Sequence, residues 1–360
     1  MSEITKQNIE QALSSVKDIY LDDDLITLKS INDIKIEADN VSIELELNYP
    51  AKSYHQTLKD NITTALTNIG VKKVTINITT KILAHSVQKG LQGLPDVKNV
   101  IAIASGKGGV GKSTTSVNIA LALQAEGAKV AILDADIYGP SIPKMLGIQK
   151  QKPESTAEGK LLPILGHKMQ SMSVGFLVPE DSPMIWRGPM VTQALEQLLR
   201  DTLWRNVDYM IIDLPPGTGD TQLTLSQKIP VSGSVIVTTP QDIALLDAKK
   251  GLKMFEKVSI PILGIVENMS LHICSKCGHE EEIFGVNGGK NMAEENNTTF
   301  LGALPLEMGI REAMDLGNPT LAQDENSKTS MLYKEIAKKL TAKLAKQPKE
   351  IASFPSITIE

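Results

Sequence analysis

Residues 106–114 read Gly106-Lys107-Gly108-Gly109-Val110-Gly111-Lys112-Ser113-Thr114. This run matches the pattern of glycine, any four residues, glycine, lysine and then serine or threonine, which is typical of phosphate-binding loops. An apolar run at 100–104 comes directly before it, and a run of helical character follows and ends at Gly127. The order of strand, glycine loop and helix favours a nucleotide phosphate site over an unliganded glycine-rich turn.

The residue types in this loop suit phosphate chemistry. Glycines let successive backbone N–H groups converge on phosphate oxygens, and the N-terminus of the following helix adds positive potential. We expect Lys112 to pair with the β- and γ-phosphates and the Ser113 hydroxyl to ligate Mg²⁺. The loop from Gly106 to Thr114 is therefore the expected site of a nucleoside triphosphate and its metal ion.

Short apolar runs without alternation extend beyond this loop and are separated by helical stretches. Such runs are typical of parallel strands whose two faces are both covered by helices. The candidate strands lie at 100–104, 130–133, 209–212, 234–238 and 262–266. We therefore expect the α/β fold of a P-loop NTPase, with a mostly parallel sheet flanked by helices.

The N-terminal part of the chain has a different pattern of apolar residues. Apolar residues recur at helical spacing near 9–16 and 58–69, and they alternate with polar residues at 41–47. This pattern predicts a small α/β accessory domain with the order helix, strands, helix, strand. The expected organisation is an accessory domain at 1–83, a linker with glycine and proline breakers at 84–98, the ATPase domain at 99–347 and a tail at 348–360.

Composition excludes several classes of protein. Lys plus Arg number 37 and Asp plus Glu 42, so the formal charge of −5 exerts no overall attraction for nucleic acid. Every apolar run is far shorter than the ~20 residues that span a bilayer. Only two cysteines are present and residues 1–6 are polar, which argues against a disulfide framework and a signal peptide. We expect a cytoplasmic protein with neither a nucleic-acid nor a membrane partner.

An additional lysine, Lys107, lies within the loop. With it the loop resembles that of the deviant Walker A ATPases, a group that includes the ParA and MinD partitioning proteins and the nitrogenase iron protein. In that group the additional lysine reaches across a dimer interface to the partner's nucleotide. The resemblance implies a nucleotide-dependent homodimer in which Lys107 acts on the partner's phosphates. A solvated loop lysine is the alternative.

Carboxylates follow two of the expected strands. Asp134 and Asp136 come after the strand at 130–133, and Asp213 comes after the strand at 209–212. The carboxyl ends of such strands face the phosphate site in parallel sheets. The resemblance implies that Asp134 supports Mg²⁺ through water and that Asp136 orients the attacking water. Asp213 resembles a Walker B aspartate, and a plain turn is the alternative for the pair at 134 and 136.

Two further residues are candidates for nucleotide contacts. Gly217, in the segment after Asp213, is expected to offer its N–H to the γ-phosphate as part of a mobile switch. Asn268 follows the strand at 262–266. The resemblance implies that Asn268 reads the adenine edge and selects ATP over GTP, and a capping role is its alternative.

Both cysteines of the chain, Cys274 and Cys277, lie three residues apart. Two thiols can ligate one metal centre, but a four-coordinate site needs two more ligands. A second subunit can supply its own pair, so that four thiolates hold a [4Fe-4S] cluster on a two-fold axis. Alternatively, His272 and His279 complete a zinc site within one chain. A redox dithiol and a pair of inert thiols remain as further possibilities.

The combination of this loop with the Cys-x-x-Cys pair resembles the Mrp/ApbC family of iron–sulfur cluster carriers. The N-terminal unit is similar to the MIP18-type domain that bacterial members carry, although Ile19 stands where that domain usually has proline. The segments that carry the resemblance are 136–143, Trp186-Arg187-Gly188-Pro189-Met190, 213–220 and the cysteine pair. The resemblance implies a homodimer that holds a labile cluster, hydrolyses ATP slowly and exchanges the cluster with apoproteins and the cluster assembly machinery.

Three other functions fit parts of the pattern. A spatial organiser of the MinD or ParA kind needs a surface-binding element, for which the basic amphipathic stretch at 331–347 is the best candidate. We expect that stretch instead to dock on the ATPase body with its lysines solvated. An electron-transfer reductase like the nitrogenase iron protein and an ATPase switch stabilised by structural zinc are the remaining alternatives.

Overall fold

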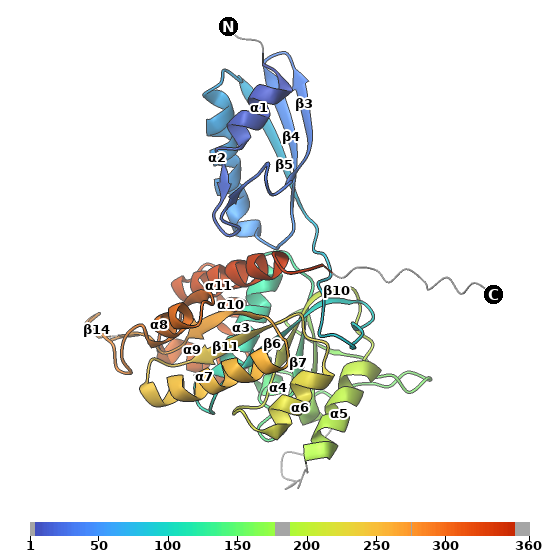
Figure 1. The fold of residues 1–360 in the computed structure, drawn as a ribbon. Helices are drawn as coiled ribbons and strands as arrows, with labels where there is room; N and C mark the ends of the chain where they lie inside the picture. The colour runs from blue at the N-terminus through green and yellow to red at the C-terminus, as the bar shows by residue number, and fades with distance from the viewer. Residues whose placement is uncertain (1–3, 177–187, 275, 350–360) are drawn as a thin grey trace, which may run out of the picture.

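The computed structural model describes residues 4–176, 188–274 and 276–349. It consists of a small N-terminal unit that sits on a larger α/β unit, and the chain passes between them once as β5 leads toward β6 (Figure 1). In the described part of the chain, no helix combines the length and apolar character needed to cross a membrane.

The larger unit is built on one eight-stranded sheet with the order β15-β12-β11-β6-β10-β7-β9-β8. All neighbouring strands pair in parallel except β8, which is antiparallel to β9. The bounds are β6 (Val97–Ala104), β7 (Val130–Asp134), β8 (Ile164–Gly166), β9 (Met169–Ser173), β10 (Val207–Asp213), β11 (Gly233–Thr238), β12 (Ile262–Glu267) and β15 (Phe300–Ala303).

Helices cover both faces of this sheet. α3 and α11 lie on the face that carries the N-terminal unit, and α6 and α7 lie on the opposite face (Figure 1). The helices are α3 (Lys112–Ala125), α4 (Ile142–Met145), α5 (Gly188–Asp201), α6 (Asp220–Lys228), α7 (Asp242–Lys257), α8 (Gly288–Glu295), α9 (Met308–Asp315), α10 (Thr320–Gln323) and α11 (Lys328–Ala345), with a 3₁₀ turn η2 at Val174–Phe176.

The central strands are apolar because both of their faces are buried. Every residue of β7, β10 and β11 is buried, which is the environment that unalternating apolar runs predict. All five strands expected from the sequence are present. The predicted fold, a mostly parallel P-loop NTPase sheet with a small N-terminal α/β domain, is confirmed.

The N-terminal unit has its own core between a sheet and two helices. Its sheet has the order β3-β4-β5, with β3 and β4 antiparallel and β4 and β5 parallel. Val41, Ile43, Leu45 and Leu47 alternate inward along β4 as their sequence pattern predicts. The elements are α1 (Lys6–Leu13), β1 (Lys17–Asp18), β2 (Asp23–Asp24), β3 (Ile31–Glu37), β4 (Asn40–Leu47), η1 (Lys52–Tyr54), α2 (His55–Thr67) and β5 (Lys73–Thr80).

The C-terminal helix α11 joins the two units. Its Ala342 and Ala345 belong to the apolar core of the N-terminal unit, while the rest of the helix packs on α3. Lys338 donates to Ser53 Oγ at 3.0 Å and is buried, as is Lys334. The expectation that this helix docks on the protein body is confirmed. The expectation that its lysines are solvated is wrong for these two. Lys338 lies against Ser53 and the Tyr20 ring of the N-terminal unit, and Lys334 pairs with Glu325 at 3.6 Å.

Candidate nucleotide site and cysteine hairpin

The glycine loop connects the end of β6 to the first residue of α3, as the strand–loop–helix pattern predicts. Gly109 and Gly111 have φ of 84° and 81°, a left-handed conformation that glycine adopts without strain. Gly106 is required for a different reason, the close approach of another backbone segment. A Cβ atom on it would lie 2.2 Å from the backbone carbonyl carbon of Asp247, so only glycine permits α7 to approach the loop this closely.

Asn268 touches the loop from the end of β12. Its Nδ2 donates to the carbonyl oxygen of Val110 at 2.9 Å, and a Cβ atom on Gly111 would lie 2.1 Å from the same nitrogen. The side chain therefore holds the loop in the described structure. Its role in reading adenine stays a prediction.

Lys112, the first residue of α3, lies among buried carboxylates. Its Nζ is 2.7 Å from Asp213 Oδ2 and 3.9 Å from Asp136 Oδ2. Ser113 Oγ donates to Asp213 Oδ2 at 2.6 Å. The structure therefore brings together the lysine, the hydroxyl and two of the three aspartates that the sequence selects.

The charge of this cluster is unbalanced. Asp134, Asp136 and Asp213 are buried around the single lysine Lys112. Burial, followed by the nearby charge of Asp213, raises the pKa of Asp134 to about 7. Burial also raises the pKa of Asp136, and the charge of Lys112 opposes this rise. A divalent cation would relieve the excess negative charge, and the oxygens of Ser113 and Asp213 are donors that Mg²⁺ accepts.

Two serines that the sequence reasoning missed hold the aspartates in place. Ser116 Oγ donates to Asp213 Oδ1 at 2.6 Å, and Ser173 Oγ donates to Asp134 Oδ2 at 3.0 Å. Ser116 lies one helical turn after Ser113, a spacing that places both hydroxyls on one face of α3. Ser173 has no local signal, because only the pairing of β9 with β7 brings it to Asp134.

Gly217 and Lys107 make backbone hydrogen bonds to Ser105 in the described structure, and their roles at the phosphates stay predictions. The Gly217 N–H donates to the Ser105 carbonyl at 3.0 Å, so it must leave this bond to reach a γ-phosphate. The half-buried Lys107 has a backbone carbonyl that accepts from Ser105 Oγ at 2.9 Å. Trp186 and Arg187, quoted for the family resemblance, lie outside the described residues.

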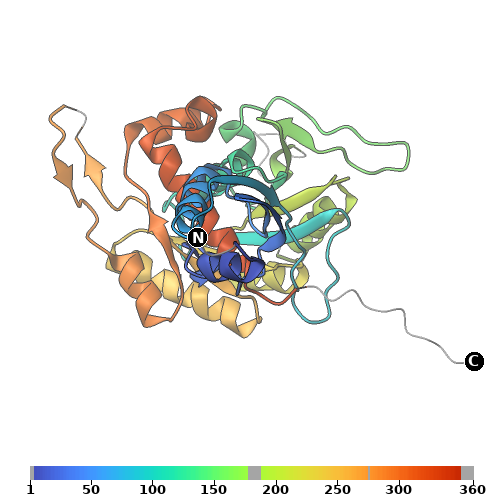
Figure 2. The ribbon, with the colours of Figure 1, turned by 90° about the horizontal axis from the view of Figure 1, so that it is seen from above.

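The cysteine pair lies at the tip of a hairpin formed by β13 (His272–Ile273) and β14 (Glu280–Glu281), which projects from the edge of the larger unit (Figures 1 and 2). The Cys274 N–H donates to the His279 carbonyl at 2.9 Å and closes the turn. Both thiols are free, and Cys277 is exposed. The backbone N–H of Lys276, and next that of Cys277, lower the pKa of the Cys274 thiol, which favours the thiolate that binds metals.

The histidines beside the cysteines do not complete a local metal site. His272 Nδ1 lies 3.0 Å from the Leu306 carbonyl oxygen, and His279 Nε2 lies 3.8 Å from Glu281 Oε1. Within residues 4–176, 188–274 and 276–349, no three His, Cys, Asp or Glu side chains gather where they could hold a metal ion. The pair therefore lacks two ligands within the described part of its own chain.

The hairpin is tied to the nucleotide loop through a short segment. Asn268, which contacts the loop, is six residues before Cys274. Between them, the Ser270 N–H donates to the Leu304 carbonyl at 3.0 Å and the Leu306 N–H donates to the Leu271 carbonyl at 2.8 Å. The two sites are thus ends of one hydrogen-bonded segment.

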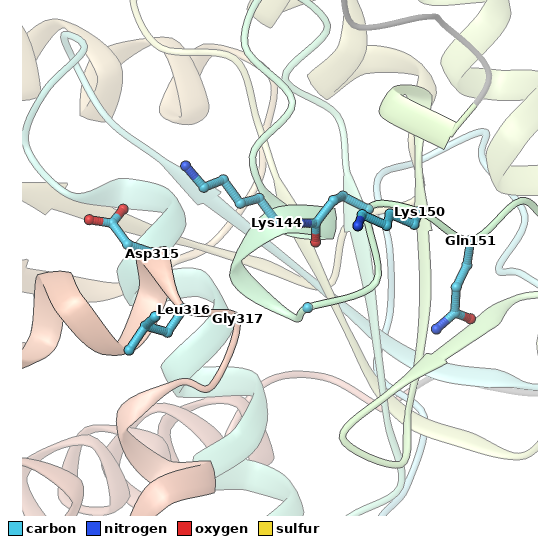
Figure 3. Close-up of a pocket in the computed structure, with 8 residues that line it drawn as sticks. Lys144, Lys150, Gln151, Asp315, Leu316 and Gly317 are labelled. Atoms are coloured by element: carbon cyan, nitrogen blue, oxygen red, sulfur yellow. The ribbon is translucent and has the colours of Figure 1, made fainter.

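A hollow of about 370 Å³ lies elsewhere, between α4 and the end of α9. Figure 3 shows that Lys144, Gln151 and Asp315 around it point in different directions and do not converge on one point. This arrangement does not form a ligand site comparable with the carboxylate cluster.

Comparisons with known proteins agree with this geometry. A family model described as NUBPL iron-transfer P-loop NTPase matches residues 96–341, and one described as iron-sulfur cluster assembly protein matches residues 6–78. The chain is 50% identical over 333 residues to an iron-sulfur cluster carrier protein of Salmonella typhimurium, covering 91% of this chain and 90% of that protein. It is 49% identical over 263 residues to the iron-sulfur cluster transfer protein NUBPL of Mus musculus, covering 72% and 81%.

Solved structures resemble the larger unit. A nucleotide-binding protein of Archaeoglobus fulgidus in complex with ADP has a TM-score of 0.56 and 34% identity, covering 64% of this chain and 90% of that one. The cell division ATPase MinD of Pyrococcus furiosus has a TM-score of 0.52 and 22% identity, covering 67% and 98%, which shows the shared fold. The matched residues, the high identity and the glycine loop place this chain in the NUBPL iron-transfer P-loop NTPase family, with an N-terminal domain of the iron-sulfur cluster assembly type.

Proposed function

We propose that this protein is an ATP-hydrolysing carrier that holds a labile [4Fe-4S] cluster between two copies of the chain and transfers it to apoproteins in the cytoplasm. The observation that carries the proposal is the pair of free thiols, the half-buried Cys274 and the exposed Cys277, which lacks two ligands in the described part of its own chain. The names of its relatives, cluster carrier and cluster transfer proteins, point to the same cargo.

A second copy of the chain is the simplest source of the missing ligands. Two symmetric Cys-x-x-Cys pairs provide the four thiolates that a [4Fe-4S] cluster takes. Exposed apolar side chains support an interface beside the nucleotide loop. Ile243 and Leu246 on α7 are 69% and 60% exposed, one helical turn apart and next to Asp247, which contacts Gly106.

The carboxylate cluster supports ATP binding and slow hydrolysis. Lys112, which pairs with Asp213, would hold the β- and γ-phosphates, and the Ser113 hydroxyl, which donates to Asp213, would hold the metal ion. Bound Mg²⁺ supplies neutralising charge for the phosphates and the buried carboxylates. Asp136, 3.9 Å from Lys112, would orient the attacking water, and Lys107 of each subunit would contact the partner's phosphates.

The spatial-organiser alternative depends on a surface-binding helix. The helix expected to serve it, α11, packs on α3 and its Lys334 and Lys338 are buried. The structure offers no observation that favours this alternative over cluster transfer.

The test is anaerobic reconstitution with iron and sulfide, followed by analysis of iron, sulfide and zinc per chain and sedimentation of the product. About two irons and two sulfides per chain in a dimer are expected for one [4Fe-4S] cluster, with loss of both in Cys274→Ala and Cys277→Ala. His279→Ala is the matched control and should keep the cluster. About one zinc per chain, lost in His279→Ala, would contradict the proposal and favour a local zinc site.

A further inference from the structure

We propose that Ser173 is a positioning residue for ATP hydrolysis, which acts through Asp134 on the loop that carries Asp136. This inference rests on the proposed hydrolysis, and it adds a residue that lies outside the nucleotide loop and the aspartate motifs. Its basis is a chain of buried hydrogen bonds from β9 to the loop at 135–141.

The first link joins β9 to β7. The two strands pair in parallel with Ser173 opposite Asp134. Ser173 Oγ donates to Asp134 Oδ2 at 3.0 Å and accepts from the Gly175 N–H at 2.9 Å. Both side chains are buried, so the two bonds determine the orientation of this hydroxyl.

The second link joins Asp134 to both ends of the loop. Asp134 Oδ1 accepts from the Asp136 N–H at 3.1 Å, and Asp134 Oδ2 accepts from the Ile142 N–H at 3.1 Å. One carboxylate therefore tethers the beginning of the loop, where Asp136 lies, and its end, where α4 begins. Asp134 is fully buried, and both of its carboxylate oxygens accept hydrogen bonds from the loop.

A separate contact holds the same loop near its end, at Pro140. A Cβ atom on Gly175 would lie 3.1 Å from Pro140 Cβ, so η2 packs directly on the loop. By contrast, Tyr138 is 66% exposed and lies between the two tethered ends. β9 thus restrains the loop by the hydrogen bond from Ser173 to Asp134, and η2 restrains it by packing on Pro140.

Loss of the Ser173 hydroxyl should loosen this loop without touching the phosphate site. Asp134 would lose its only described side-chain donor and keep two backbone donors, so Asp136 would occupy its position near Lys112 less of the time. We expect kcat of Ser173→Ala to fall about tenfold, which equals ~1.4 kcal/mol. The Kd for ATP should change less than twofold, because Ser173 makes no bond to the residues at 106–114.

The matched control is Ser171→Ala. Ser171 lies on the same strand and is equally buried, but its hydroxyl donates to the Met169 carbonyl at 3.2 Å and makes no contact with Asp134. A second readout is independent of hydrolysis: chymotrypsin cleavage after Tyr138, followed by mass spectrometry of the fragments. Ser173→Ala should be cleaved there about tenfold faster than the wild type, and Ser171→Ala should match the wild type.

The outcomes separate this inference from the proposed function. If the wild type hydrolyses ATP and the two serine variants lose kcat and gain cleavage alike, the positioning role of Ser173 is wrong. If the wild type does not hydrolyse ATP but Ser173→Ala is cleaved faster, the tether is correct and the proposed hydrolysis fails. A Ser173→Ala protein with raised Kd and unchanged kcat would also overturn the inference.

Discussion

The sharpest test of the architecture concerns Gly106, which meets the backbone of α7 at close range. A Cβ atom at this position would lie 2.2 Å from the Asp247 carbonyl carbon and 2.4 Å from the Ala248 nitrogen. Ordinary contact begins at 3.4 Å, so Gly106→Ala requires the loop and α7 to separate by about 1.2 Å.

The effect of this separation on the free energy of unfolding can be compared with that at other overpacked sites. Inserting a methyl group into a packed interior typically costs about 1–3 kcal/mol. Here both atoms met by the methyl group belong to the backbone of α7, which cannot rotate away as a side chain can. We therefore expect a loss near 3 kcal/mol, which lowers the Tm of a domain of this size by roughly 6–12 °C.

Gly108→Ala is the matched control. No heavy atom lies within 4 Å of a Cβ atom there, and Gly108 does not have the left-handed φ that would strain alanine. The two variants thus make the same substitution, two residues apart in one loop. In nucleotide-free protein we expect Gly108→Ala to stay within about 0.5 kcal/mol of the wild type.

Thermal unfolding of the nucleotide-free variants, followed by circular dichroism, measures the difference. A Tm of Gly106→Ala within about 2 °C of that of Gly108→Ala would refute the reasoning, because it would mean that α7 does not pack on the loop in solution. ATP affinity, measured by calorimetry, should fall in Gly106→Ala as the displaced loop loses its phosphate geometry.

Three further predictions follow from single interactions. Asn268→Ala should lower the free energy of unfolding by about 1 kcal/mol, measured by urea unfolding, because it removes the amide donor from the buried Val110 carbonyl; an unchanged value would contradict the loop-holding role. The pKa of Asp134 is raised from 3.8 to about 7 in the folded state, so between these pH values the folded state binds one more proton than the unfolded state. The stability of nucleotide-free protein should therefore fall as the pH rises from about 4 to 7, by up to ~4 kcal/mol, and Asp134→Asn should flatten this slope in urea unfolding at pH 5 and pH 8. Lys338→Ala should lower the free energy of unfolding in urea by about 2 kcal/mol, because it removes the charged partner of Ser53 at the contact between the two units, whereas the exposed control Lys339→Ala should stay within about 0.5 kcal/mol of the wild type.

The N-terminal unit lies at the far end of α3 from the phosphate loop. α3 begins at Lys112, and beyond its last turn Glu126 accepts from the Ser53 N–H at 2.8 Å. The helix has 14 residues, so the unit lies roughly 20 Å from the phosphate loop. The N-terminal unit therefore makes its contact at the end of α3 that lies away from the nucleotide loop.

Much of this protein was readable from local sequence. The glycine loop and the unalternating strands predicted the parallel sheet, because each pattern reflects the immediate environment of its own backbone. Lys112, Ser113, Asp136 and Asp213 were found for the same reason, since strand ends and helix starts meet at one edge of the sheet. The cysteine spacing predicted a metal-binding pair.

Tertiary structure alone decided the rest. Ser173 reaches Asp134 only because β9 pairs with β7, and Lys338 is buried only because the N-terminal unit, nearly 300 residues earlier in the chain, closes over α11. The role of Gly106 likewise depends on α7, some 140 residues later. The local sequence around each of these residues does not predict its partner. Only packing between distant elements brings their atoms within bonding distance.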